Sequence, residues 1–206
     1  MFRIYFVLLA ALGLAACGMP PEFSHPLGQP LGSQSDHKRL AGVWVAFHNG
    51  KKDGAMIIYL RSDGKGGLLV NLITAGTGSE KRKVFWWRGT AFASRIDGEL
   101  YVNFRRIKGK GDDYTAPGLT PGYSVVKVDF ETKDLVRVWL MNNFRVRDLI
   151  EQGRLKGRKV MGQFAGMNIP YSRVSNGPGD LRRLLLEVGS GLMSTDGHLF
   201  RRSPPP

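Results

Sequence analysis

The chain has 206 residues, a formal net charge of +13 and a single cysteine. This length suits one domain, and one cysteine excludes an intramolecular disulfide. The basic balance indicates either an anionic partner or a solvated basic surface, and both readings stay open at this point.

Residues 1–16 have the layout of a secretory signal peptide. Arg3 lies near the amino end, an apolar run extends from Ile4 to Leu12, and Ala15 and Ala16 close the segment. A membrane-spanning helix needs about 20 apolar residues, so this run is too short to span. We therefore expect export, and nucleic acid is no longer a natural partner for the charge. Anionic lipid headgroups, lipopolysaccharide phosphates and acidic wall polymers are the partners that remain.

The residues Leu14-Ala15-Ala16-Cys17 resemble the lipobox of bacterial lipoproteins. The resemblance implies cleavage before Cys17, lipidation of its thiol and attachment to a membrane through the acyl chains. Two or more acyl chains make such an anchor firm. Gly18, rather than an aspartate, follows the cysteine, and the resemblance then implies the outer membrane, with the protein facing the periplasm.

Residues 17–38 are rich in Pro, Gly, Ser and Gln and have no hydrophobic period. We predict a lipidated flexible tether there, with a root-mean-square reach of roughly 25 Å. His25 and His37 are then solvated side chains, because neither has a partner at metal-ligand spacing. The folded domain is predicted over 39–202, with a disordered tail over 203–206.

From Leu40 onward, short apolar runs alternate with turn residues, and each run predicts a strand. Asp97-Gly98 predicts a primed turn, which needs positive φ at both residues. The alternation after it puts Leu100, Val102 and Phe104 on one face. Because most of the strands form hairpins, we expect a mainly β fold in which an antiparallel meander closes into a barrel of about eight strands. The predicted strands are 43–48, 55–61, 68–74, 82–88, 90–96, 99–106, 123–130 and 135–141.

Two helices and one further strand are expected after the meander. Asn143 is predicted to cap a helix through Gln152, with Gly153 ending it. A strand is predicted over 158–164. Asp180 is predicted to cap a C-terminal helix in which leucines recur at helical spacing.

Gly42-Val43-Trp44, at the opening of the first predicted strand, resembles the Gly-x-Trp motif of the lipocalin family. The resemblance implies a barrel in which Trp44 packs across the closed end and a late arginine, Arg137 or Arg145, covers it. A barrel of eight strands is either filled by its own side chains or holds one small ligand. The apolar residues predicted to line the interior are Phe47, Ile58, Leu69, Phe85, Phe92, Leu100, Phe104, Val126 and Trp139.

No motif for catalysis, a metal or a cofactor emerges from the sequence. Gly-x-Ser-x-Gly is absent, and no two histidines stand at i, i+2 or i, i+4. An enzyme would have to gather Asp112, Asp113 and His48 in one cleft. We therefore expect a non-enzymatic protein without a cofactor.

Basic residues fall in three clusters along the chain. Lys81-Arg82-Lys83 precedes Trp86-Trp87, and further clusters occupy 105–110 and 154–159. Because neighbouring strand residues face opposite sides, one of the two tryptophans should lie in the core and the other outside. An outward Trp beside Lys and Arg suits a membrane interface or a glycan-stacking surface.

Together these features predict a lipoprotein of the cell envelope that binds a small apolar or amphiphilic ligand, or an anionic envelope component. The alternative is a structural protein with a filled barrel that contacts the cell wall or envelope proteins. A continuous cavity above about 300 Å³ would favour the ligand binder. A packed interior with an exposed apolar patch would favour the interaction protein.

Overall fold

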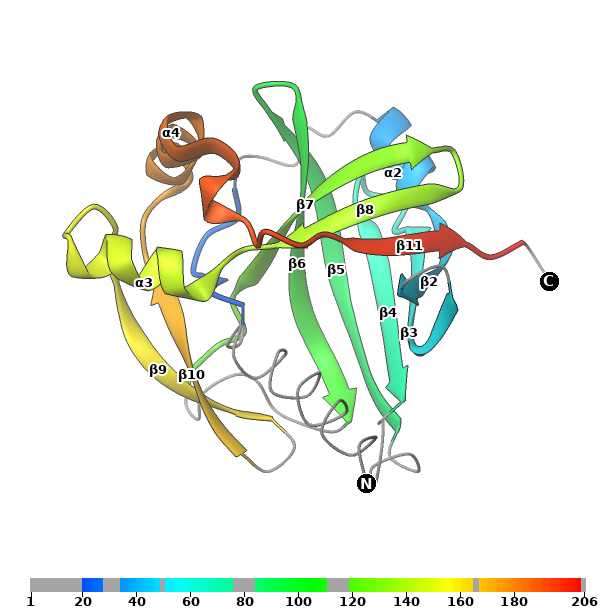
Figure 1. Ribbon diagram of the computed structural model, residues 1–206, viewed down its shortest axis with the longest axis horizontal. Coiled ribbons are helices and arrows are strands. Elements are labelled where there is room, and N and C mark those ends of the chain that lie inside the picture. The colour runs from blue at the N-terminus through cyan, green and yellow to red at the C-terminus, as the bar shows by residue number, and fades with distance from the viewer. Residues whose placement is uncertain are drawn as a thin grey trace, which may run out of the picture.

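A computed structural model describes residues 20–27, 34–48, 51–75, 84–110, 119–164 and 167–204. The fold is mainly β, and eight antiparallel strands close into a barrel (Figure 1). Seven strands follow one another around the barrel, and the last lies between β8 and β2. The closed antiparallel barrel is therefore confirmed. Its strands are β2 (Gly42–His48), β3 (Lys51–Ser62), β4 (Leu68–Ala75), β5 (Val84–Ile96), β6 (Glu99–Lys110), β7 (Tyr123–Thr132), β8 (Leu135–Leu140) and β11 (His198–Arg202).

β5 is one long strand where the sequence predicts two, over 82–88 and 90–96. The strand is continuous, and its register with β6 shifts between Arg88 and Gly89. A Cβ at position 89 would lie 2.3 Å from the carbonyl oxygen of Arg105, so only glycine allows the two backbones to approach this closely. The unpaired extra residue is Ile107 of β6, so Gly89 lies opposite a β-bulge and does not mark a turn.

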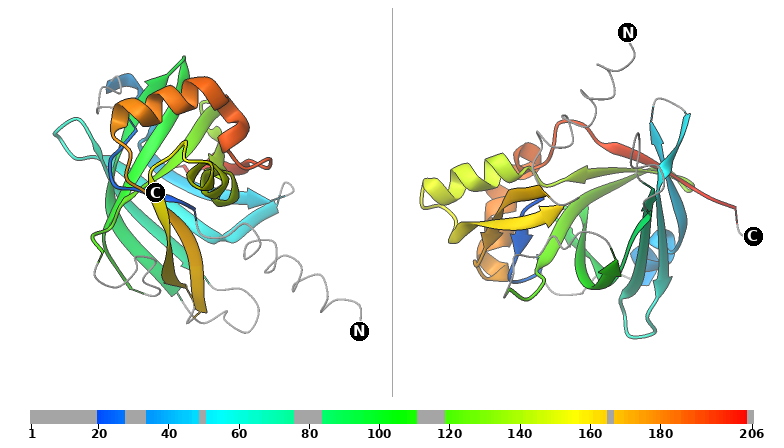
Figure 2. Two further views of the ribbon diagram at one scale, coloured as in Figure 1. Left: turned by 90° about the vertical axis from the view of Figure 1, so that its left-hand side faces the viewer. Right: turned by 90° about the horizontal axis from the view of Figure 1, so that it is seen from below.

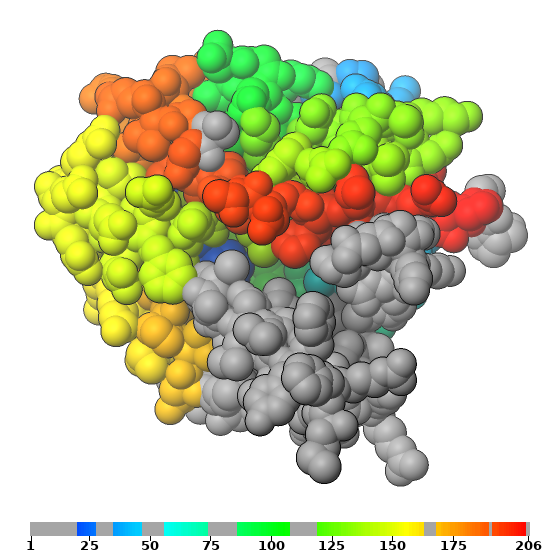
Figure 3. Space-filling view, in the orientation of Figure 1, coloured from blue at the N-terminus to red at the C-terminus, as the bar shows by residue number. Residues whose placement is uncertain are grey.

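The eighth barrel strand comes from the C-terminus, where the sequence predicts none. In β11, Phe200 pairs with Ala46 of β2 on one side and with Val136 of β8 on the other. Figure 3 shows this strand lying along β8 on the front of the molecule. A strand of five residues with two arginines has a weak apolar pattern, so the two neighbouring edges decide its structure.

Residues 143–192, between β8 and β11, pack on the outside of the barrel (Figure 2). A second core forms between this unit and the outer face of the barrel wall, with Tyr101 and Val125 of the wall almost fully buried in it. The predicted strand over 158–164 is confirmed. The elements of the unit are α3 (Asn143–Glu151), β9 (Gly157–Phe164), β10 (Met167–Val174), α4 (Pro178–Val188) and the 3-10 turn η2 (Gly189–Leu192).

Both predicted helices exist, but their caps differ from the predicted ones. Asn142 caps α3, and its Oδ1 accepts hydrogen bonds from the amides of Phe144 and Arg145 at 2.9 and 3.3 Å. Asn143 is buried instead and accepts a bond from the Ser172 amide of β10. Gly153, with a φ of +72°, follows α3 as predicted. α4 begins at Pro178 after Gly177, so Asp180 lies within its first turn.

Residues 20–27 and 34–40 belong to the folded domain, which corrects the predicted flexible tether. In β1 (Glu22–Phe23), Phe23 pairs with Tyr123, the first residue of β7, and β1 also runs parallel to β10. Phe23 and Leu27 are 2% and 1% exposed. The Leu27 amide donates a 2.7 Å hydrogen bond to Oδ1 of Asn103. Isolated apolar residues among prolines show no period, so their burial becomes visible only in the tertiary structure.

His37 is a buried side chain and not a solvated one. It lies in α2 (Gln34–Leu40), and its Nε2 accepts a 3.0 Å hydrogen bond from the Ala93 amide of β5. Next to it, the buried carboxylate of Asp36 receives Nε and Nη2 of Arg95 at 2.9 and 2.7 Å. His25, by contrast, is exposed as predicted.

Candidate functional site

The two ends of the barrel differ in how tightly their inward side chains are buried. At the end where β5 meets β6, Leu68, Val70 and Ala93 are each 0% exposed and Val102 is 1% exposed. The turn at this end has φ of +52° and +77° at Asp97 and Gly98, as predicted. This end is filled by side chains, and we call it the closed end.

Trp44 and Arg202 seal the closed end. The Arg202 guanidinium carbon lies 4.5 Å from the centre of the Trp44 ring, and the Trp44 Nε1 donates to the Leu40 carbonyl at 2.7 Å. Arg202 also donates to the carbonyls of Ala41 and Arg39, which fixes the chain leaving α2. The covering arginine is therefore the last residue of β11, not Arg137 or Arg145.

Both predicted covering arginines have other surroundings. Arg137 forms an ion pair with Glu131 at 2.5 Å, and Arg145 is exposed on α3. Arg202 could not be singled out because its strand was not predicted.

Gly42 is required by this arrangement. Its φ is +135°, a conformation that L side chains rarely adopt, and a Cβ there would lie 2.8 Å from Nη1 of Arg202. The Gly-x-Trp spacing thus gives the guanidinium room to reach Trp44.

At the opposite, open end, the inward side chains are apolar but only partly buried. Trp87 and Phe104 meet edge to face there, with ring centres 6.4 Å apart and an angle of 83°. Leu72 pairs with Trp87, which places a third large side chain beside the two rings. Side chains that alternate inward and remain partly exposed form an apolar inner wall that solvent reaches. Its members are Ala46, Met56, Ile58, Leu72, Trp87, Phe104, Val138 and Leu140.

Four of the residues predicted to line the interior do so. Leu100, Phe104, Ile58 and Val126 belong to the core inside the barrel. The side chains of Phe47 and Phe85 lie outside the described part of the chain, as do Asp112, Asp113 and the side chain of His48. Whether Asp112, Asp113 and His48 gather in one cleft, as an enzyme would require, is therefore not tested.

Three predicted interior residues point outward instead. Phe92 lies between the inward Ala91 and Ala93 and packs against Tyr123 on the outer face, with ring centres 6.2 Å apart. Trp139 packs against the outer core, and the Lys127 Nζ lies 5.5 Å from its ring centre. Leu69 follows Leu68 and precedes Val70, both inward, so alternation turns it outward. A second core covers the outer wall, so large apolar residues occur on both faces of the sheet. The size of a side chain therefore did not show whether it faces the barrel interior.

Trp87 is the interior aromatic that the sequence did not resolve from its neighbour. Trp87 lies in the inner core and Trp86 does not, which confirms that the pair divides between the two faces. Alternation along β5 is unbroken from Ala93 back to Trp87, so the inward face of Ala93 and Ala91 identifies Trp87 as the interior ring. The sequence alone did not show which face of this strand is inside.

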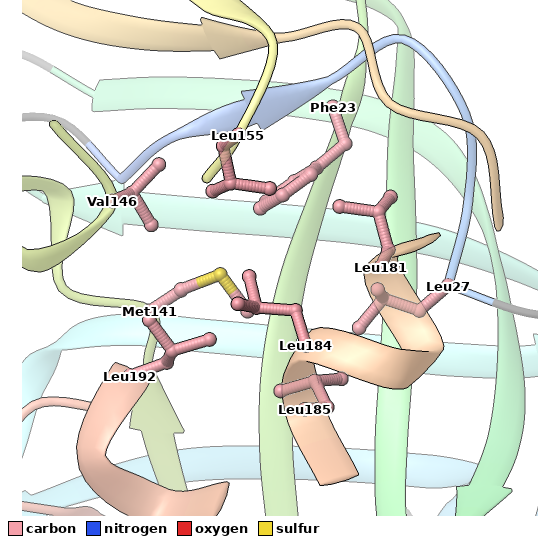
Figure 4. Close-up of a pocket in the computed structure, with 9 residues that line it drawn as sticks. All are labelled: Phe23, Leu27, Met141, Val146, Leu155, Leu181, Leu184, Leu185 and Leu192. Carbon is pink, nitrogen blue, oxygen red and sulfur yellow. The ribbon is translucent and has the colours of Figure 1, made fainter. Parts of the chain in front are cut away.

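Two pockets lined by described residues lie outside the barrel. One, of about 10 Å³, sits in the second core between α4, β1 and η2, and every side chain around it is apolar (Figure 4). A void of this size holds at most one water, and an apolar lining keeps it dry. The other, of about 190 Å³, lies beside Glu99, Tyr101 and Leu185. Both are smaller than the roughly 300 Å³ of a ligand site.

The second pocket contains an internally neutralised pair. Lys127 donates to Glu99, and this bond holds the pKa of the Glu99 carboxyl below its usual value. Burial raises the pKa of the Tyr101 hydroxyl, which donates to the same carboxylate at 3.1 Å. The Glu99 carboxylate is therefore already hydrogen-bonded by Lys127 and Tyr101.

Within the described ranges, no helix is long and apolar enough to cross a membrane. The same part of the chain holds no group of three His, Cys, Asp or Glu side chains that could bind a metal ion. Comparison with protein-family models, with curated proteins and with solved structures finds no match.

Proposed function

We propose that the protein is a lipid-anchored envelope lipoprotein whose barrel binds one small apolar or amphiphilic molecule at its open end. The observation that carries the proposal is the partly exposed apolar inner wall around Trp87 and Phe104, above a floor sealed by Trp44 and Arg202. A sealed floor leaves one way in, so a ligand would place its apolar part against the wall and keep its polar part at the mouth.

The chemistry of the wall favours a hydrocarbon or ring ligand over a polar one. Burying apolar surface contributes about 25 cal/mol per Å², and this wall offers few polar side chains to orient a polar solute. At the rim, Ser124 is partly exposed, and His198 shares the inward face of β11 with Phe200 and is exposed. These are the groups nearest to the head of a bound amphiphile.

Two features support the family resemblance and the anchor. Gly42 and Trp44 with Arg202 form the floor arrangement that the lipocalin resemblance implies, with a late arginine on the tryptophan. The lipobox resemblance would put the acyl chains on Cys17, close in the chain to the folded domain. We therefore propose a lipocalin-like protein held at the outer membrane and facing the periplasm.

Ligand binding is tested by titration with a fluorescent fatty acid, 11-dansylaminoundecanoic acid. Phe104→Asp puts a charge on the inner wall and should weaken binding at least tenfold, or about 1.4 kcal/mol. Phe92→Asp is the matched control, because Phe92 lies on the outer wall. Since Phe104→Asp can also disturb folding, Trp87→Phe provides a second reading: energy transfer from tryptophan to the bound dansyl group should fall while binding persists.

Two results would contradict the ligand proposal. One is that the wild-type chain fails to bind the probe and its native mass spectrum shows no copurifying lipid. The other is equal weakening by Phe104→Asp and Phe92→Asp. Either would favour the interaction protein with a filled barrel.

A further inference from the structure

We infer that the barrel docks end-on against the bilayer, with its open mouth and the outer wall of β3–β5 facing anionic lipid headgroups. This orientation rests on the proposed lipid anchor at Cys17 and adds a second, non-covalent contact with the same membrane. The surface would otherwise be an exposed apolar patch without a role.

The first observation is the short distance between the anchor and the fold. Pro20 is the first described residue, and it lies three residue steps along the chain from Cys17, with two residues between them. A fully extended chain spans at most about 3.6 Å per residue, so the lipid-bearing Cα lies within about 11 Å of Pro20. A lipid at Cys17 would therefore hold the domain at the membrane surface, rather than on a tether of roughly 25 Å.

The second observation is where this attachment lies on the barrel. Phe23 pairs with Tyr123, and Tyr123 pairs with Arg105 of β6, next to the inward Phe104 of the mouth. In Figure 1 the closed β5–β6 turn is at the top, β6 ends at the bottom, and the blue residues 20–23 enter beside the start of β7. The segment that follows the anchor thus joins the barrel wall beside Phe104, one of the residues that line the open end.

The third observation is a row of exposed apolar side chains on the outer wall of the same half. Ile57 pairs with Ile73, and Ile73 pairs with Trp86, so the three lie side by side across β3, β4 and β5. Ile57 is 38% exposed and Ile73 46% exposed, while Trp86 is partly buried. Tyr59, on the same face of β3 as Ile57, extends this apolar surface and is 41% exposed.

A basic side chain borders this row. Arg88 is exposed on β5, and its Nε donates to the Asn71 side chain of β4 at 3.1 Å. A Trp and aliphatic residues beside an arginine match the composition of membrane interfaces, where rings sit at headgroup depth and cations meet lipid phosphates.

A second exposed arginine lies in the same half of the barrel. Arg105 of β6 pairs with Tyr123, the first residue of β7, and its side chain is exposed. Each basic residue that reaches an anionic surface contributes about 1 kcal/mol to the attraction.

The docked orientation has a consequence for the proposed ligand. With the mouth against the headgroups, an amphiphile would pass from the bilayer into the barrel without crossing bulk water. The chain would then exchange molecules with its own membrane, and a membrane amphiphile is the ligand class that this geometry favours.

The test reconstitutes the full chain, purified from a bacterial envelope, into vesicles of phosphatidylcholine and phosphatidylglycerol with brominated acyl chains. Bromine quenches tryptophan at bilayer depth, and Trp86→Phe removes the signal of Trp86 while Trp44, Trp87 and Trp139 stay. We expect the wild-type chain to lose at least twice as much fluorescence as Trp86→Phe. Vesicles of phosphatidylcholine alone should reduce the difference.

Ile73→Asp places a charge in the middle of the row and should abolish the Trp86 quenching. Leu186→Asp is the matched control, because Leu186 is 53% exposed on α4, outside this surface. Equal quenching in Ile73→Asp and Leu186→Asp would overturn the docking surface.

The anchor and the docking surface fail in different ways. Wild-type chain that floats with the vesicles while Trp86 stays unquenched keeps the anchor and overturns the docking. An intact mass without acyl chains overturns the anchor. In that case, binding of the soluble chain to the anionic vesicles that Ile73→Asp removes would support the docking surface by itself, and no binding would overturn it.

Discussion

Replacing Arg202 with alanine should destabilise the closed end of the barrel. The change removes two hydrogen bonds to the carbonyls of Ala41 and Arg39. It also removes the stacking of the guanidinium carbon 4.5 Å from the centre of the Trp44 ring. A hydrogen bond from a charged donor contributes about 1.5–3 kcal/mol, and a cation over a ring about 0.5–2 kcal/mol. The Arg202 side chain is 27% exposed, so water replaces part of each interaction. We expect a loss of about 3 kcal/mol in the free energy of unfolding.

The assay is urea unfolding followed by tryptophan fluorescence, on a chain that begins at Gly18. With a slope of about 2 kcal/mol per molar urea, the midpoint should fall by about 1.5 M. Arg183→Ala, on the exposed face of α4, is the control and should change stability by less than about 0.5 kcal/mol. Equal urea midpoints for the two variants would refute the conclusion that Arg202 stabilises the closed end.

A double-mutant cycle then tests why position 42 is glycine. In the wild-type background, Gly42→Ala introduces both the unfavourable φ and a Cβ 2.8 Å from the guanidinium. In the Arg202→Ala background only the backbone strain remains, at about 1–3 kcal/mol. The cost of Gly42→Ala should therefore be at least about 1 kcal/mol smaller there. An equal cost in both backgrounds would show that the close contact with Arg202 contributes nothing.

Two further predictions concern the N-terminal segments. Asn103→Ala leaves the buried Leu27 amide without its 2.7 Å acceptor and should cost about 1–3 kcal/mol; hydrogen exchange should speed up over residues 22–27, and unchanged protection there would contradict the prediction. Burial lowers the pKa of His37 below 6.5, so the unfolded chain binds the proton more readily than the folded one. The neutral His37 therefore contributes stability that is complete above pH 6.5 and is lost as the pH falls through the lowered pKa of the folded state. The urea midpoint should drop between pH 7.5 and 5.5, and His37→Gln, which still offers an acceptor to the Ala93 amide, should flatten the drop.

The sequence by itself determined the local features of the fold. Alternating apolar runs and turn residues predicted the antiparallel hairpins of the barrel, the primed turn at Asp97-Gly98, the Gly153 stop and the division of Trp86 and Trp87 between two faces. Each of these depends on residues close together in the chain, where backbone conformation and side-chain direction follow from local chemistry.

The tertiary structure decided which face of each strand is inside and which segments belong to the fold. Phe92 and Trp139 are large and apolar, yet they point outward, because α3, β9, β10 and α4 cover the outer wall and make it a second core. Neither the residues around Phe23 nor those of β11 show a hydrophobic period in the sequence. Phe23 nevertheless fills the second core, and β11 closes the barrel. Their stability comes from partners far away in the chain: Phe23 pairs with Val174, and Phe200 of β11 pairs with Ala46. The identity of such partners is not contained in any local pattern.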